Sequence, residues 1–197
     1  MPSIISLSDI PRSQFNKIRQ SFQCSNIQLQ EHITRYAYSH QKIGLFQTYF
    51  YMDDEENYLG YISVAPATIQ RDNIEDEIEI PNSIKYSIPA IKITRLCTFD
   101  GYCQQGVGSS LMLFSTILGV IQQKIIGCRA IIVDSKPEAV DFYKNLDFKE
   151  IDQTEDSDTI FMVNDILKPK DLERSIEQMV SFCKIFNQTD LIELLKS

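Results

Sequence analysis

Histidine, paired cysteines and long apolar runs are scarce in this sequence, and each shortage excludes a class of protein. Only two of the 197 residues are histidine, His32 and His40. Two histidines offer few residues for a serine–histidine triad or a histidine-rich metal centre. We expect both histidines to serve packing and no metal to be bound. No apolar run reaches the roughly 20 residues that a membrane-spanning helix needs. The N-terminus also lacks the basic and then apolar layout of a signal peptide, so we expect a cytoplasmic protein without membrane contact.

The cysteines are odd in number, scattered, and form no Cys-x-x-Cys pair. This pattern favours reduced thiols in a cytosol over disulfides or a structural zinc site. Cysteine catalysis is disfavoured too, because no histidine lies near Cys97 or Cys103 in the sequence. The five are Cys24, Cys97, Cys103, Cys128 and Cys183.

Basic residues are outnumbered by acidic ones, 19 to 27, for a net charge of −8. A general nucleic-acid coat is disfavoured, because phosphate binding draws on clustered Lys and Arg, but a local basic patch stays open. Acidic residues gather in residues 53–56, 72–79 and 150–158. The second run fits a solvated surface, and selection of a basic substrate is the alternative. The 43% hydrophobic content is ordinary for one globular domain with a modest extension.

The first half of the chain predicts two helices followed by a hairpin. Ser8 and Asn26 are candidate helix caps, and Pro11 suits a first helical turn. Alternating strand formers around an acidic turn predict the hairpin, which Pro66 would end. The expected elements are a helix over Leu7–Phe22, a helix after Asn26 with Leu29, Ile33, Tyr36 and Ala37 inward, strands over Gly44–Met52 and Tyr58–Val64, and an irregular segment over Arg71–Pro89 with room for a short strand.

The second half predicts a strand–helix–strand unit, which implies a right-handed parallel crossover. Gly127 is a natural end for the long helix, and Ser135 with Pro137 suits the start of a short one. The expected elements are a strand over Ala90–Phe99, a helix to about Ile126 with Leu111, Phe114, Leu118, Ile121 and Ile125 on its apolar face, a strand over Arg129–Val133, a helix to Leu146, and a closing hairpin of Phe148–Ile151 and Thr159–Val163.

After Leu167 the composition changes. The segment Lys168–Lys170 reads as a linker, and two helical patterns follow, the second capped by Thr189. We expect a main domain over residues 1–167 and a helical extension over 168–197. Docking of the extension on its own domain is favoured over a partner. The stripe that would dock consists of Leu172, Ile176, Met179, Val180 and Cys183.

The most informative stretch is Ile91–Ser110, a buried-strand pattern, a polar loop with glycines, and the start of the long helix. The first N–H groups of a helix lack internal partners, and Gly106 and Gly108 would let a diphosphate approach them. A tight turn that feeds a core helix fits the same pattern. The phosphate-loop pattern fails because no Gly-Lys-Ser/Thr end is present, and the dinucleotide pattern lacks its third glycine.

Two motifs in the right order resemble the GNAT family of N-acetyltransferases. The run Cys103-Gln104-Gln105-Gly106-Val107-Gly108 resembles its Gln/Arg-x-x-Gly-x-Gly/Ala loop, with Cys103 at the first position. The segment Ala139-Val140-Asp141-Phe142-Tyr143, followed by Leu146-Asp147-Phe148, resembles its Ala-x-x-Phe-Tyr-x-x-x-Gly-Phe segment, with Asp147 in place of glycine. Within the family the chain looks similar to the branch that contains bacterial toxin acetyltransferases, on Phe22–Cys24, Ile93–Leu96 and Gly127–Val133.

The resemblance implies an α/β (α+β) fold with a mixed, splayed central sheet flanked by helices, and acetyl-CoA as co-substrate. Acetyl would pass directly to a primary amine, with an amide near Cys97 or Thr98 stabilising the oxyanion and Tyr143 protonating the leaving thiolate. The implied cofactor-binding residues are Leu96, Cys97, Thr98, Cys103, Gln104, Gln105, Gly106, Val107, Gly108, Ser109, Ser110, Ala139 and Phe142.

The acceptor and the general base stay open at this point. The core strand carries no Asp or Glu, so water, a backbone carbonyl or the acceptor's own amine is left as base, while Lys92 and Arg95 are placed to meet a phosphate or carboxylate. Aminoacyl-tRNA is one candidate acceptor, as in a toxin of a toxin–antitoxin pair. A CoA-binding interaction module without catalysis and an α/β scaffold without coenzyme are the alternatives. A homodimer is compatible with the sequence.

Overall fold

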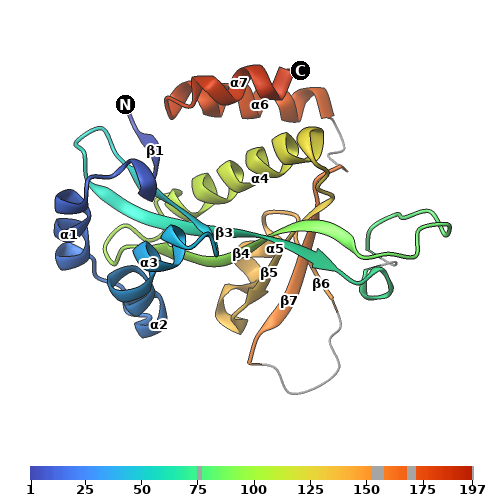
Figure 1. Ribbon diagram of the computed structural model, residues 1–197, viewed down its shortest axis with the longest axis horizontal. Helices are drawn as coiled ribbons and strands as arrows, with labels where there is room; N and C mark the ends of the chain where they lie inside the picture. Colours follow the sequence, from blue (N-terminus) through green and yellow to red (C-terminus); the bar gives the residue numbers. More distant parts are fainter. Residues whose placement is uncertain (75–76, 152–157, 168–171, 197) are drawn as a thin grey trace.

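The centre of the protein is a seven-stranded sheet in the order β1-β2-β3-β4-β5-β7-β6 (Figure 1). The computed structural model describes residues 1–74, 77–151, 158–167 and 172–196. All neighbouring strands pair antiparallel except β4 and β5, which are parallel, as the strand–helix–strand pattern predicts. The strands are β1 Ser3–Ser6, β2 Gln47–Met52, β3 Tyr58–Ile69, β4 Ile88–Thr98, β5 Ala130–Ser135, β6 Lys149–Glu150 and β7 Ile160–Asp165.

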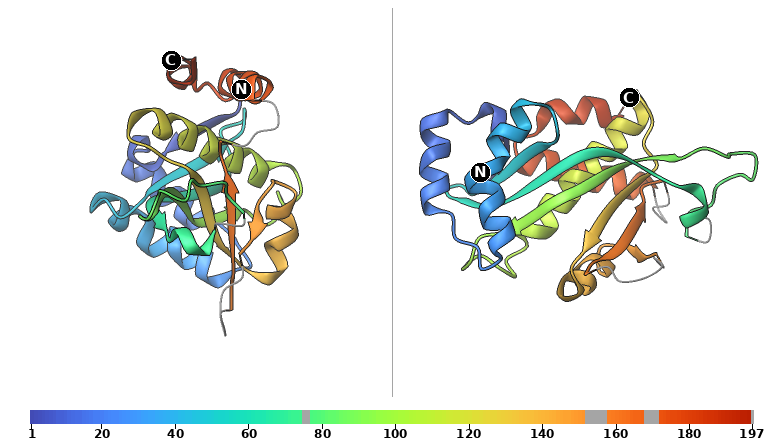
Figure 2. Two further views of the ribbon diagram at one scale, coloured as in Figure 1. Left: turned by 90° about the vertical axis from the view of Figure 1, so that its right-hand side faces the viewer. Right: turned by 60° about the horizontal axis from the view of Figure 1, so that its bottom comes forward.

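Helices cover both faces of this sheet (Figures 1 and 2). On one face the long helix α4 lies across the strands, and the two C-terminal helices lie outside it. On the other face the N-terminal helices cover one end of the sheet. The helices are α1 Arg12–Ser21, α2 Ile27–Glu31, a π-helical turn His32–Tyr36, α3 Ala37–Lys42, α4 Val107–Ile125, α5 Val140–Lys144, α6 Leu172–Ile185 and α7 Thr189–Lys196. The predicted mixed sheet flanked by helices is confirmed.

Three apolar clusters hold these layers together. The largest surrounds α4 and includes residues of β3, β4, β5, α5 and both C-terminal helices. The second joins α1 and the π-helical turn to the ends of β3 and β4. The third joins the segment after β3 to β5 and β7. Because the second and third clusters lie apart on the face opposite α4, the sheet between them is left for polar side chains.

The first helix begins later than predicted, at Arg12 and not at Leu7. Before it, Ser3–Ser6 forms a strand that the sequence did not predict, β1 on the edge of β2, because its main-chain groups pair with Tyr49–Met52. A short 3-10 turn follows, and it is Ser6, not Ser8, whose side chain accepts the capping hydrogen bond, from the Ser8 N–H. The Asn26 cap is confirmed, since its side chain accepts from the N–H groups of Gln28 and Leu29.

Pro66 does not end the hairpin, as the sequence suggested. Strand β3 runs through it to Ile69, with Pro66 opposite Ile91 of β4. On the other side β2 pairs with β3 only as far as Val64. Beyond Val64 one edge of β3 therefore lacks a strand partner, and a proline there removes no ladder hydrogen bond on that edge.

Two side chains lie elsewhere than the periodicity predicts, and one predicted helix cap is wrong. Tyr36 is 44% exposed, because the π-helical turn shifts the inward face of this helix. Ile125 is 64% exposed at the last turn of α4. Ser135 ends β5 and donates to the Lys136 carbonyl, so it does not cap the next helix, which opens instead with a 3-10 turn at Pro137. Gly127 does end α4 as predicted, with φ +92° and its N–H on the Gln122 carbonyl.

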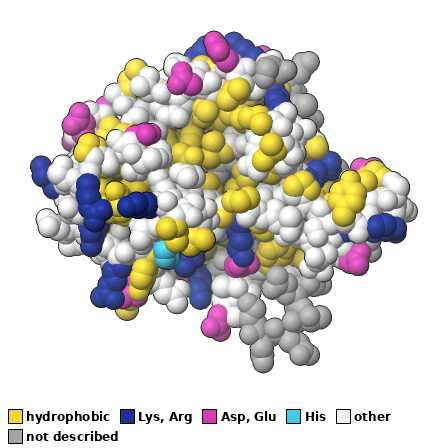
Figure 3. All heavy atoms as spheres, viewed as in Figure 1, with side chains coloured by type: hydrophobic (Ala, Val, Ile, Leu, Met, Phe, Trp, Pro, Cys, Tyr) yellow, Lys and Arg dark blue, Asp and Glu magenta, His cyan; other side chains and the backbone are white. Residues whose placement is uncertain are grey.

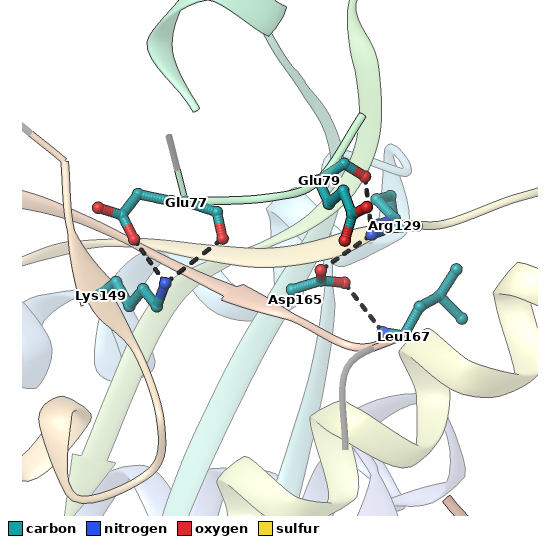
Figure 4. A network of polar contacts seen from close by, with 6 residues as sticks. All are labelled: Glu77, Glu79, Arg129, Lys149, Asp165 and Leu167. Atoms are coloured by element: carbon teal, nitrogen blue, oxygen red, sulfur yellow. Dashed lines mark hydrogen bonds and ion pairs between the residues drawn. The ribbon is translucent and has the colours of Figure 1, made fainter. Parts of the chain in front are cut away.

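The segment between β3 and β4 is anchored rather than loose. Ile74 and Ile78 are buried against β5 and β7, and among its described residues the regular structure before Ile88 is a 3-10 turn, not a strand. Figure 4 shows its acidic residues engaged with basic ones: Glu77 pairs with Lys149, and the Glu79 carbonyl accepts from Arg129. Glu77 is therefore a structural partner and is not free to select a basic substrate.

The C-terminal helices dock on the main domain. Met179, Cys183 and Leu195 are buried in the cluster around α4. Lys124 of α4 donates to the carbonyls at the end of α7, and Gln188 donates to the Ile4 carbonyl of β1. The linker residues 168–170 lie outside the described residues, as do 153–157 of the predicted closing loop. Among the helices of the described ranges, none combines the length and apolar character required to cross a bilayer.

His32 is buried in a polar group within the N-terminal helical layer. Its Nε2 lies 3.3 Å from the Ser63 hydroxyl, which shares a 2.8 Å hydrogen bond with Thr48. Its ring stacks on Tyr61 at 5.8 Å. Burial, and secondarily the charge of Arg95, lowers the pKa of His32 from its ordinary 6.5 to about 4. The side chain is therefore neutral at pH 7 and serves packing, as the sequence suggested.

This lowered pKa predicts a loss of stability in mild acid. The unfolded chain binds a proton at His32 as the pH falls below 6.5, whereas the folded chain resists it until about pH 4. The contribution of His32 to the free energy of unfolding therefore decreases as the pH falls from 6.5 to about 4, by roughly 3 kcal/mol at most. We expect His32→Gln, which keeps a hydrogen-bonding side chain without titrating, to lose less unfolding free energy between pH 7 and pH 4.5 in urea melts. Equal losses in both proteins would contradict this assignment.

Candidate active site

The parallel strands β4 and β5 separate partway along their length. They pair from Ala90 and Ala130 to Ile93 and Val133, and no further. Strand β4 nevertheless continues to Thr98 and β5 to Ser135. The second half of β4 therefore has a main-chain edge without a strand partner, which is the splay that the resemblance implies. Such an edge accepts an extended ligand by strand-like addition.

A bulge at Thr94 turns the side chains of β4 over at the same point. Ser63 of β3 pairs with Arg95 and Val64 pairs with Ile93, so Thr94 is an extra residue, and its hydroxyl donates to the Ser63 carbonyl. Before the bulge Ile93 faces α4, and after it Leu96 does. A one-residue insertion reverses the alternation of side chains between the two faces of a strand. Ile93 and Leu96 therefore face the same side of the sheet although they are three positions apart.

The alternation of main-chain groups decides which residues face the opening. The Phe99 N–H donates to Leu59 of β3, and the Cys97 carbonyl lies toward Gly60 of the same strand. Neighbouring residues in a strand direct their N–H and C=O groups to opposite edges. Leu96 and Thr98 therefore direct theirs to the β5 side, where the partner strand is absent. Cys97 directs its main chain to β3 and its side chain to the second apolar cluster.

The loop after β4 prepares the start of α4 for an anion. Gln104 and Gly106 adopt left-handed backbone conformations, with φ of +61° and +81°. Gly106 is the N-cap of α4, and no side chain caps the helix. The Ser110 N–H begins the helical ladder on the Gly106 carbonyl, whereas the N–H groups of Val107, Gly108 and Ser109 have no acceptor among the described residues. Unsatisfied amides at a helix start bind phosphates.

The two sequence motifs meet at Gly108. A Cβ built on Gly108 would lie 3.3 Å from the Phe142 ring and 3.7 Å from the Thr98 hydroxyl. A side chain at this position would therefore press on the Phe142 ring, whereas at Gly106 glycine is favoured by the positive φ. Strand β4, the glycine loop and α5 are brought together at one point. The order and spacing of the two motifs do not predict this contact.

Tyr143 lies beside this point with its ring buried and its hydroxyl in reach of solvent. The residue is 6% exposed and packs edge-on against Phe142 at 5.1 Å and Phe148 at 5.4 Å. Its hydroxyl makes no hydrogen bond within the described residues, yet it is not among the side-chain oxygens sealed from solvent. Burial raises the pKa of Tyr143 to about 12, so the phenol keeps its proton throughout the neutral range.

The remaining predicted site residues frame the loop with less direct roles. The Gln105 side chain donates to the Gly101 carbonyl at 3.1 Å, which ties the loop to itself. Cys103 is exposed, and its thiol points back to the Phe99 carbonyl at 3.8 Å. Ala139 ends the 3-10 turn that precedes α5. The main chain of Ser110 belongs to the helical ladder, so its N–H is not free as those of the preceding residues are.

A carboxylate at the opening was missed by the sequence reasoning, which looked for one only on the core strand. Asp134 is the first residue of β5 beyond its pairing with β4. It alternates with Ile132 and so lies on the face opposite α4, where its side chain is 40% exposed and pairs with Lys92. The exposed Arg95 follows the bulge on the same face. The signal was available in principle, as a charged residue at the end of an otherwise apolar strand.

Comparison with known proteins identifies the family. The family model described as "Acetyltransferase (GNAT) domain" matches residues 37–168. A structure described as a bacterial toxin has a TM-score of 0.72 at 16% identity, covering 85% of this chain and 93% of that one. AtaT complexed with acetyl-methionyl-tRNAfMet has a TM-score of 0.68 at 20% identity, covering 82% and 94%.

A third solved structure agrees in fold. A tyrosine-to-phenylalanine mutant of KacT has a TM-score of 0.67 at 18% identity, covering 81% of this chain and 93% of that one. At these identities the likeness concerns the fold, whereas the family follows from the match over two thirds of the chain. The chain belongs to the GNAT family and is an acetyl-CoA-dependent N-acetyltransferase.

Proposed function

We propose that the protein transfers acetyl directly from acetyl-CoA to a primary amine held at the opening between β4 and β5. One observation carries the proposal. The free amides at the start of α4 adjoin the unpartnered edge of β4, and both adjoin α5 through the contact of Phe142 with Gly108. The place for a diphosphate, the place for an extended arm and a phenol therefore lie in one region.

The coenzyme takes its place along this region by main-chain contacts. The pyrophosphate binds the amides of residues 104–109, where the dipole of a 19-residue helix adds positive potential. The pantetheine arm runs along β4 and pairs with Leu96 and Thr98, whose main-chain groups face the opening. Because these contacts use the backbone, the replacement of the family's Gln or Arg by Cys103 leaves them intact.

The transfer needs a place for charge at two atoms. The acceptor's neutral amine attacks the thioester carbonyl carbon, and the oxygen that becomes negative accepts a hydrogen bond from the amide of Thr98 or Leu96. Collapse of the tetrahedral intermediate breaks the carbon–sulfur bond. The departing thiolate takes a proton from the Tyr143 hydroxyl, and the amine's surplus proton leaves to water or to a nearby acceptor.

Tyr143→Phe tests this role. The change removes the proton donor while the ring keeps its contacts with Phe142 and Phe148. We expect kcat to fall by about 10²–10⁴-fold, with the KM for acetyl-CoA changed much less. Because burial holds the pKa of Tyr143 near 12, the wild-type rate will show no titration of this phenol between pH 6 and 9. Acetyl-CoA turnover against a panel of amines is the measurement.

Two results of that experiment would count against the proposal. Unchanged kcat in Tyr143→Phe would remove the phenol from the mechanism. Binding of acetyl-CoA by the wild-type protein without transfer to any amine would favour a CoA-binding module. AtaT has also been solved as a tyrosine-to-phenylalanine mutant bound to acetyl-CoA, so a protein of this fold tolerates such a change.

On the acceptor side, we assign Asp134 to the acceptor's ammonium group. It is the first residue of β5 beyond the pairing with β4 and faces the side opposite α4, between the two smaller apolar clusters. Its partner Lys92 is 36% exposed, so the pair is open to exchange with an incoming cation. A carboxylate there binds the acceptor in its ammonium form at the opening. The ammonium then loses one proton to water, which leaves the neutral amine beside the thioester.

Asp134→Asn should therefore raise the KM for the amine about tenfold or more and leave acetyl-CoA binding unchanged. The measurement is steady-state kinetics with each substrate varied in turn. Asp54→Asn, an exposed carboxylate in the turn between β2 and β3, is the matched control and should behave as wild type. An acceptor KM that Asp134→Asn leaves unchanged would exclude this residue from the acceptor site.

Aminoacyl-tRNA is the acceptor that a specific surface favours. Residues 1–46 carry five Lys or Arg and only two Asp or Glu, in a chain whose net charge is −8. Figure 3 shows basic side chains gathered on the side where α1 to α3 lie. Of these, Arg35 pairs with Glu31, while Lys17, Arg19 and Lys42 are exposed. A local basic patch of this kind can contact phosphates despite the acidic total.

Aromatic rings lie in the same surface. Tyr36 is stacked on His40 at 5.6 Å, and His40 meets Phe46 edge-on at 5.5 Å. Exposed aromatic rings beside basic residues are how proteins hold unpaired nucleotides. A protein of the same fold, AtaT, has been solved with acetyl-methionyl-tRNAfMet. The basic and aromatic layer lies on the same face of the sheet as Asp134, on which an acceptor would enter.

The triple variant Lys17→Glu, Arg19→Glu and Lys42→Glu tests this acceptor. We expect its KM for aminoacyl-tRNA to rise by more than tenfold and the slope of log KM against log salt to fall by about 2–3. A small amine acceptor should be acetylated as by wild type. The control reverses three basic residues elsewhere, with Lys85→Glu, Lys184→Glu and Lys196→Glu. Similar losses in both variants would show that net charge, not this surface, sets the affinity.

A further inference from the structure

Two cysteine thiols face each other at the end of β4. The Sγ atoms of Cys24 and Cys97 are 3.0 Å apart, although the residues are 73 positions apart in the sequence. Cys24 lies between α1 and α2, and Cys97 lies in the half of β4 that does not pair with β5. Both residues are free thiols. The site described above uses neither side chain, since the Cys97 side chain faces the second apolar cluster.

Contacts on both sides of the pair hold the two segments in place. The Asp100 N–H donates to the Gln23 carbonyl at 3.0 Å, and the rings of Phe22 and Phe99 meet edge-on at 4.2 Å. The Cys24 N–H donates to the Gln30 side chain at 2.9 Å. These hydrogen bonds and the ring contact hold the α1–α2 connection against the end of β4, and so bring the two thiols together.

We propose that Cys24 and Cys97 form a reversible disulfide when the protein meets a low-molecular-weight disulfide. The Cys24 thiolate attacks one sulfur of the oxidant, forms a mixed disulfide and releases one thiolate. The Cys97 thiolate then attacks the Cys24 sulfur and releases the second. The pair loses two electrons to the oxidant, and its two protons go by way of solvent to the two released thiolates.

Exposure gives the order of these steps. Cys24 is partly exposed and is the sulfur that an oxidant can reach, whereas Cys97 is buried. Burial, and then the hydrogen bond to Cys24, raises the pKa of Cys97, so this thiol is a poor first nucleophile. It resolves the mixed disulfide because it is already in contact with its target. Cys103 is exposed but has its thiol on the Phe99 carbonyl instead.

The disulfide would shift the part of β4 along which the thioester is proposed to bind. A disulfide requires the two sulfurs at about 2.05 Å, so they must approach by about 1 Å, which draws the α1–α2 connection toward β4. Cys97 stands between Leu96 and Thr98, the two residues whose main chains face the opening. A shift of that size in the groups that position a reacting carbonyl lowers turnover by about 10²-fold. The disulfide also closes a long loop and raises the Tm.

The experiment treats the full-length protein with oxidised glutathione. We expect a species lighter by two hydrogens, a tryptic peptide pair that links Cys24 to Cys97, a Tm higher by several degrees, and recovery on addition of dithiothreitol. Where turnover is measured, it falls on oxidation and returns on reduction. Mass and Tm do not depend on the acceptor, so the outcome is independent of the proposed function.

Cys24→Ser and Cys97→Ser should each abolish the lighter species, while Cys103→Ser, at the exposed neighbouring thiol, should leave it unchanged. If one of these two variants does not fold, the other still tests the proposal. The proposal is overturned if oxidation links Cys103 instead, or if only glutathione adducts without an internal disulfide accumulate. It is also overturned if the disulfide forms and neither turnover nor Tm changes.

Discussion

Main-chain hydrogen bonding between β4 and β5 stops at Ile93 and Val133, and the rest of the site depends on where it stops. Backbone N–H and C=O groups in a folded protein must find partners, so an edge left open is a place where a ligand replaces a strand. The bulge at Thr94 reverses the side chains of β4 at the same position. The strand can thereby bury Leu96 toward α4 and Cys97 toward α1 while its free edge stays in the opening.

The layers around the sheet divide the chemistry between its faces. The cluster around α4 holds the helix start and Tyr143, to which the proposed function assigns the coenzyme, and it is extended by the docked C-terminal helices. The opposite face is covered at its two ends by separate apolar clusters, and Lys92 and Asp134 lie between them. An acidic chain with a basic N-terminal layer places its favourable potential for anions on that same face.

Local patterns predicted the elements whose causes are local. Asn26 caps its helix, Gly127 ends α4 in a left-handed conformation, and the crossover from β4 to β5 is parallel. Patterns failed where a neighbour overrode propensity. Ser3–Ser6 is a strand because β2 offers it an edge, and β3 continues through Pro66 because its outer edge is already unpaired there.

The sequence by itself determined the family, through two motifs of fixed order and spacing. These motifs can be recognised from sequence because a glycine turn and the helix that follows it depend on consecutive residues. Only the tertiary structure decided which main-chain groups of β4 are free, since pairing with β3 selects alternate residues. It also decided that Asp134 faces the opening and that Cys24 meets Cys97. These are contacts between segments far apart in the chain, and they depend on strand register and packing, to which no local pattern is sensitive.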